Sequence, residues 1–136
     1  TIEHKTEIPV ELRAKISNWI FGCDECLTVC PYTARQRETD WHELKQASGF
    51  GSVLKIQELF EIRSNREYRR RFGTSAISRA NRKQLLRNAA VVLGNSGSQE
   101  ALPVLKKALV DSSPLVREHA QWAIDRILSR QLNSVS

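Results

Sequence analysis

The chain has few cysteine, proline and glycine residues and no long apolar segment. Of its 136 residues only three are cysteine, four proline and six glycine, and none is methionine. Three cysteines leave one unpaired and nothing indicates secretion, which disfavours a disulfide framework. No apolar run approaches the roughly 18 residues of a membrane span, and no segment has a convincing strand pattern. We therefore expect a soluble, cytoplasmic, all-α protein without membrane contact.

The chain begins with Thr rather than Met, and Thr1-Ile2-Glu3-His4 is typical of the interior of a longer protein. No signal peptide pattern is present. At 136 residues and 40% hydrophobic content, the chain can form one modest domain, or a small motif joined to a helical domain. We expect it to be a fragment.

The three cysteines share one short segment, Cys-Asp-Glu-Cys-Leu-Thr-Val-Cys-Pro. Cys23, Cys26 and Cys30, followed by Pro31, match the last three cysteines of a bacterial ferredoxin run. Soft thiolates at this spacing can fold around an iron cluster, and proline prevents a regular helix from continuing through that point. The first cysteine of the run is absent, so a cluster needs a further ligand from elsewhere.

Other uses of this segment are weaker. A zinc site could take Cys23 and Cys26 with His4 or His42, but the histidines lack the paired spacing of a zinc finger. A radical-SAM site has the two spacings in the reverse order. Packing alone does not require such a spacing.

Basic charge is concentrated between positions 63 and 87. The net charge is +6 overall, yet nine basic residues and one acid in this segment give +8, which leaves 12 basic and 14 acidic residues elsewhere. A basic stripe with interleaved aromatic residues is the expected footprint of a phosphate backbone. A solvated helix face is the alternative; membrane attachment is disfavoured because a broad apolar face is missing. The candidate nucleic-acid contacts are Arg63, Arg66, Arg69, Arg70, Arg71, Arg79, Arg82, Lys83 and Arg87.

Helix signals recur along the chain. Pro9 opens an apolar helical pattern, and Gly22 allows a turn into the cysteine segment. A short amphipathic helix is expected from Val53 to Phe60. Ser64 to Glu67 has the form of a capping box, and the helix that follows should end at Gly73 in the left-handed conformation.

The last third predicts helices over 78–93, 98–110 and 113–128, each beginning at a serine cap. A turn is expected at Gly94-Asn95-Ser96-Gly97. A shift of 31 residues superposes the pattern of the first helix on that of the third, with small residues at matching positions. This indicates HEAT-like repeats; an ordinary three-helix bundle is the alternative.

The order of these parts resembles a known family. The stretches 1–4, 8–13 and 19–31 look like the second cluster motif of epoxyqueuosine reductases, while 72–75 and 82–95 resemble the segment and HEAT-like domain that follow it. The resemblance covers essentially the whole chain. Many relatives follow the Cys-Pro pair with Trp-Asn, whereas this chain has Tyr32-Thr33.

The resemblance implies the C-terminal part of a cobalamin-dependent oxidoreductase with two 4Fe-4S clusters, which reduces epoxyqueuosine to queuosine at the tRNA anticodon. Three parts are then expected: a cluster-binding half over 1–50, a basic connector over 51–77 and HEAT-like repeats over 78–136. Cobalamin and the general acid would belong to upstream residues, so the fragment alone should be inactive. An electron donor is implied, and a monomer is favoured.

By the ferredoxin rule, Cys23 and Cys26 would serve one cluster and Cys30 its neighbour. The competing hypothesis is an electron-transfer module of another cobalamin or ferredoxin-type protein, whose helical repeats dock a protein partner. The basic stripe favours nucleic acid.

Overall fold

The computed structural model describes residues 2–35, 37, 40–42 and 54–134. Within these ranges the regular structure is helical, without strands, as expected. None of the helices in the described ranges is long and apolar enough to cross a membrane. The expected break at residues 49–51 and the start of the helix at Val53 lie outside the described residues.

The N-terminal third contains short helices only. Helix α1 (Val10–Arg13) follows Pro9 and continues as a 3₁₀ turn, Ala14–Ile16. Helix α2 (Glu25–Thr28) ends before Pro31, and a second 3₁₀ turn covers Thr33–Arg35. Gly22 has φ +61°, so the expected turn into the cysteine segment is confirmed.

Helices α3 (Ile56–Leu59) and α4 (Asn65–Phe72) form the middle of the chain. The hydroxyl of Ser64 accepts the amide of Glu67 at 3.1 Å, which confirms the predicted cap. The Glu67 carboxylate accepts the amide of Arg63 rather than that of Ser64. The expectation of a left-handed Gly73 is wrong: its φ is −59°, because the chain continues into another turn instead of reversing.

The last third consists of α5 (Arg82–Ser96), α6 (Leu102–Ala108) and α7 (Pro114–Ser134). The predicted start at Ser78 is wrong, since Ser78 lies in the 3₁₀ turn Ala76–Arg79. Helix α5 instead begins after Asn81, because Asn81 and Gln84 exchange the two hydrogen bonds of a capping box.

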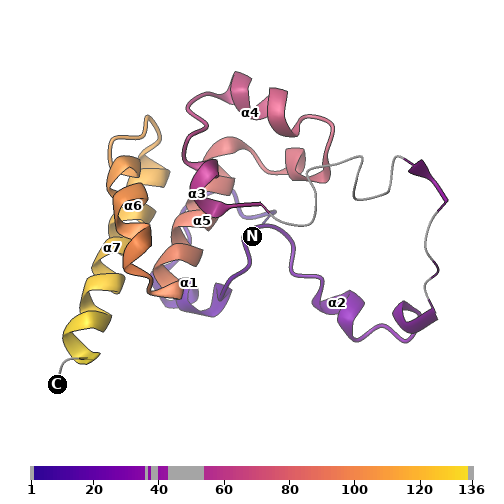
Figure 1. Ribbon diagram of the computed structural model, residues 1–136, viewed down its shortest axis with the longest axis horizontal. Helices are drawn as coiled ribbons and strands as arrows, with labels where there is room; N and C mark the ends of the chain where they lie inside the picture. The colour runs from indigo at the N-terminus through magenta and orange to yellow at the C-terminus, as the bar shows by residue number, and fades with distance from the viewer. Residues whose placement is uncertain (1, 36, 38–39, 43–53, 135–136) are drawn as a thin grey trace.

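The core lies between α5, α6 and α7, with α3 and α4 against its edge (Figure 1). Helix α7 packs along α5 and also contacts α6. The expected turn at Gly94 is wrong: Gly94 is helical, and a Cβ there would lie 2.8 Å from Ala123 Cα. The chain turns at Gly97, whose φ is +73°. The missing side chain at 94 thus lets α5 and α7 approach closely.

Candidate nucleic-acid interface and cysteine segment

The cysteine segment lies away from helices α5 to α7 (Figure 1). Cys23 and Cys26 are exposed, Cys30 is half-buried, and all three are free thiols. Asp24, at φ +50°, precedes α2, so this helix separates Cys23 from Cys30. Thr33 Oγ1 donates to Leu27 O at 2.6 Å and closes the segment after the last cysteine.

The donor type of this segment suits an iron cluster, but its arrangement does not complete one. Thiolates are the usual ligands of such clusters, four to each. Among the residues that the structure describes, no three His, Cys, Asp or Glu side chains come together as a metal site. His4 lies elsewhere, with Nε2 2.6 Å from Glu7 O. These residues alone therefore do not fit a complete cluster or a zinc ion.

Helix α4 carries three of the exposed basic residues of this segment. Its apolar side is fixed by Tyr68 and Phe72, which are buried one helical turn apart with their rings 5.1 Å from each other. The Tyr68 hydroxyl lies 2.9 Å from Ile77 O and 2.8 Å from Ala80 O, and burial raises its pKa to about 12. Helix α4 is thereby anchored to the chain just before α5, with Arg66, Arg69 and Arg70 facing solvent.

The basic residues of the segment differ in their surroundings. Arg71 pairs with Glu58 at 2.9 Å, and Arg79 pairs with Glu3 at the same distance. The remaining exposed members have no ion pair with any residue in the described part of the chain. These are Arg63, Arg66, Arg69, Arg70 and Lys83.

Hollows open beside these unpaired cations. One, of about 590 Å³, is lined by Arg69 and Lys83 together with the polar side chains of Asn81, Ser112 and Ser113. It lies where α5 and α7 both begin, so the helix dipoles add positive potential. A second, of about 490 Å³, is lined by Ser64, Arg66, Glu67 and Arg70. Cations and hydroxyl donors at these openings suit the phosphate groups of a nucleic acid.

Arg82 and Arg87 belong to the interior and are a correction to the surface stripe predicted from charge. Arg82 is 6% exposed; it pairs with Asp111 through both terminal nitrogens and donates from Nε to Ile62 O at 2.6 Å. Arg87 is fully buried, and burial lowers its pKa to about 10. Both guanidinium groups stabilise the fold and are unsuited to contact phosphate.

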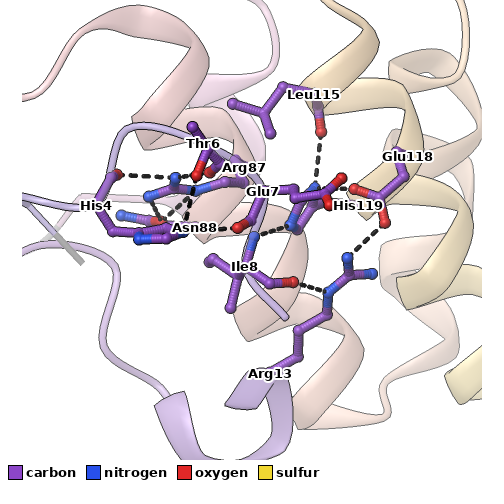
Figure 2. A network of polar contacts seen from close by, with 10 residues as sticks. All are labelled: His4, Thr6, Glu7, Ile8, Arg13, Arg87, Asn88, Leu115, Glu118 and His119. Carbon is purple, nitrogen blue, oxygen red and sulfur yellow. Dashed lines mark hydrogen bonds and ion pairs between the residues drawn. The ribbon is translucent and has the colours of Figure 1, made fainter. Parts of the chain in front are cut away.

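Arg87 is part of a polar network that fastens residues 2–20 to α5 and α7 (Figure 2). Its Nη1 donates to His4 O at 2.9 Å and to Thr6 O, while Nε and Nη2 donate to Asn88 Oδ1. Gln84 Nε2, one turn earlier on α5, donates to the carbonyls of Ile2 and His4. Side chains of α5 thus bind backbone carbonyls of the N-terminal segment.

His119 provides the attachment from α7. Its Nε2 accepts the amide of Ile8 at 3.0 Å, so the ring proton is on Nδ1, which lies 2.8 Å from Leu115 O and 2.7 Å from Glu118 Oε2. Burial lowers its pKa to about 4: the hydrogen bond to Leu115 and the charge of Glu118 raise it, but the charges of Arg13 and Arg87 lower it further. The ring is therefore neutral at pH 7.

Arg13 completes the network. It is 2% exposed, donates from Nε to Ile8 O at 2.7 Å, pairs with Glu118, and stacks 5.4 Å from the ring centre of Trp122. Sequence reasoning missed Arg13 and His119, because an isolated polar residue shows no sign of burial in the sequence. Arg13 pairs with Glu118 and His119 binds the Ile8 amide, and each partner lies more than a hundred residues away along the chain.

Comparison with known proteins agrees with this architecture. The HEAT repeats family matches residues 74–133. Epoxyqueuosine reductase of Pseudomonas aeruginosa is 40% identical over 93% of this chain, and that of Xanthomonas campestris is 39% identical over 91%; the chain spans 35% of each. An uncharacterised protein of Geobacillus stearothermophilus is 37% identical over 88% of the chain.

Solved structures give the same result. The crystal structure of an epoxyqueuosine reductase with a tRNA-Tyr stem loop superposes with a TM-score of 0.78 at 33% identity, covering 93% of this chain and 33% of that one. The enzyme from Bacillus subtilis superposes with a TM-score of 0.74 at 34% identity. Over nine tenths of its length, this chain is thus similar in sequence and fold to epoxyqueuosine reductases, and it spans about one third of their length.

Proposed function

We propose that this chain is the RNA-binding and cysteine-bearing part of an epoxyqueuosine reductase, an oxidoreductase that reduces epoxyqueuosine to queuosine in tRNA. The observation that carries the proposal is the set of unpaired cations on α4 and at the start of α5, beside two hollows of about 590 and 490 Å³. A relative of similar fold is known with a tRNA stem loop bound. In this proposal, the backbone of the tRNA anticodon region lies along α4.

Phosphate contacts of this kind orient a nucleic acid without reading its bases. Arg66, Arg69 and Arg70 supply the charge, while Tyr68 and Phe72 hold the helix that presents them. Arg63 and Lys83 extend the same surface on either side. The role of this surface is to bring the tRNA to a fixed orientation; selection of the modified base belongs to other parts of the whole protein.

The cysteine segment is proposed to supply ligands to two 4Fe-4S clusters, with Cys23 and Cys26 on one and Cys30 on the other. When bound, such clusters supply electron transfer, in this family toward cobalamin and from an external electron donor. The support is the thiol chemistry, the spacing and the similarity to the reductases. The remaining ligands would have to come from outside this chain.

A salt titration tests the RNA surface. Binding of the tRNA-Tyr anticodon stem loop is measured by fluorescence anisotropy at several salt concentrations for the chain and for Arg66→Gln/Arg69→Gln/Arg70→Gln. Each arginine that contacts a phosphate contributes about 0.7 to 0.9 to the slope of log affinity against log salt. The triple variant should therefore bind more weakly and lose about 2 to 3 units of slope.

The matched control changes the same amount of charge elsewhere. Lys5, Lys15 and Lys106 are exposed and lie outside the basic segment, so Lys5→Gln/Lys15→Gln/Lys106→Gln should keep most of the slope. Equal losses in the two triple variants would show that only net charge matters and would contradict the proposed surface.

A further inference from the structure

The chain reaches the cysteine segment through one unusual turn. Ser17 has φ 56° and ψ −121°, and the amide of Trp19 donates to Ile16 O at 3.2 Å. These angles are those of a type II′ turn, whose second residue is ordinarily glycine because a side chain is strained there. Ser17 carries a side chain, so something outside the turn must hold its conformation.

Asn95, near the end of α5, holds this turn. Its Nδ2 donates to Arg13 O at 2.8 Å and to Ser17 O at 3.0 Å. The amide group can point in one way only, because both partners are carbonyls and require a donor. The other end, Oδ1, is buried and has no hydrogen-bond partner among the described residues, which is a cost that the two donated bonds must outweigh.

Asn88 makes a corresponding contact on the other side of the turn. Two helical turns before Asn95 on α5, its Nδ2 donates to Ile20 O at 2.8 Å, three residues before Cys23. The two asparagines therefore fix the backbone before and after the turn. Between Ile20 and Cys23 there remain only Phe21 and Gly22.

We propose that Asn95 is a positioning residue: by holding the strained Ser17 turn against α5, it sets the direction in which the cysteine segment leaves the helical body. Asn88 acts at the exit of the same turn. This inference rests on the proposed function only for what the cysteines bind; the turn and its two asparagines are independent of that purpose.

Hydrogen exchange tests the hold on the turn. Asn95→Ala removes the two donated hydrogen bonds and also the unpaired Oδ1, so the net loss should be about that of one hydrogen bond. The Trp19 amide should therefore exchange about tenfold faster. Amides in the middle of α5 and α7 should keep their protection. The control is Ser96→Ala, because the neighbouring Ser96 hydroxyl donates within α5, to Leu93 O; it should leave the Trp19 amide unchanged.

A rescue variant separates positioning from general stability. Glycine adopts the backbone angles of Ser17 without strain, so Ser17→Gly in the Asn95→Ala background should restore the protection of the Trp19 amide. Ser17→Gly alone should leave the turn as it is. A loss of protection throughout α5 and α7 in Asn95→Ala, or a failure of glycine to rescue, would overturn the proposal.

Spin-label distances report the direction of the segment itself. One label is placed on Cys26 with the other two cysteines changed to serine, and the second on α7 at the exposed Gln121→Cys. The distance distribution should broaden in Asn95→Ala and narrow again with Ser17→Gly; an unchanged width in Asn95→Ala would overturn the proposal. RNA binding is a separate readout, because Asn95 lies at the opposite end of α5 from Lys83.

Discussion

Removal of the Asp111 carboxylate should be among the most damaging single changes in this chain. Both carboxylate oxygens of Asp111 accept hydrogen bonds from Arg82: Oδ1 from Nη1 at 3.2 Å and Oδ2 from Nη2. Oδ1 also accepts a hydrogen bond from the amide of Ser113 at 2.9 Å. The Arg82 and Asp111 side chains are 7% and 12% exposed. The pair joins the start of α5 to the start of α7, and Arg82 extends the link to Ile62.

The cost of Asp111→Ala follows from that burial. A guanidinium left without its carboxylate in such a place destabilises a protein by about 3 to 5 kcal/mol. For a chain of this length, that corresponds to a decrease in Tm of about 12 to 20 °C. The double variant Arg82→Met/Asp111→Leu should recover most of this loss, because neither charge then remains to be desolvated.

Urea unfolding followed by circular dichroism at pH 7 measures these differences. Asp125→Ala is the control: Asp125 is an exposed aspartate of α7 whose carboxylate accepts only from Gln121 among the hydrogen bonds described, and it should change stability by less than about 0.5 kcal/mol. The reasoning is refuted if Asp111→Ala is as stable as this control, or if the double variant is as unstable as Asp111→Ala.

The same carboxylate predicts a pH dependence. Burial raises the pKa of Asp111, but hydrogen bonds from Arg82 and the Ser113 amide, with the charges of Arg82 and Arg117, outweigh burial and hold the pKa below its ordinary 3.8. Its contribution is therefore complete above pH 3.8 and is lost as the pH falls through the lowered value. In Asp111→Ala this acid-dependent loss should be absent.

His119 adds a second pH dependence in a higher range: because its pKa is lowered from 6.5 to about 4, its contribution is complete above pH 6.5 and is lost as the pH falls toward 4. Unfolding free energies across this range should fall less steeply for His119→Gln than for the wild type; equal slopes would contradict the assignment. Anaerobic reconstitution should leave the isolated chain without a full 4Fe-4S cluster, since its three thiolates cannot complete two sites of four. Iron and sulfide analysis measures this, and a stable, stoichiometric cluster signal would count against it.

The local signals in the sequence identified the helices well where they had a chemical cause nearby. Ser64 caps α4 as expected, and Gly22 and Gly97 have positive φ because each stands at a change of direction. The start of α5 was misplaced because Ser78 and Asn81 are both good caps, and only Asn81 has a glutamine three residues later to complete the box.

The site was predicted less completely, because charge counting does not distinguish a surface from an interior. Arg82 and Arg87 add to the charge count in the same way as Arg69 and Arg70, yet they are buried against partners 20 to 83 residues away. Asn95, taken as a turn residue, is helical and binds another segment. Such pairings depend on tertiary structure, which no local pattern contains.

The way in which α5 and α7 hold residues 2–20 has a consequence for how this segment can change in evolution. Gln84, Arg87, Asn88, Asn95 and His119 bind main-chain carbonyls and one main-chain amide of the segment. Most side chains there are therefore free to be replaced, since the contacts do not involve them. The length of the segment, in contrast, is constrained. One insertion or deletion between Ile2 and Ile20 would move the carbonyls that follow it in the sequence away from their donors on α5. We expect relatives to keep the length of this stretch, together with the buried Ile8 and Arg13, and to vary at its exposed positions.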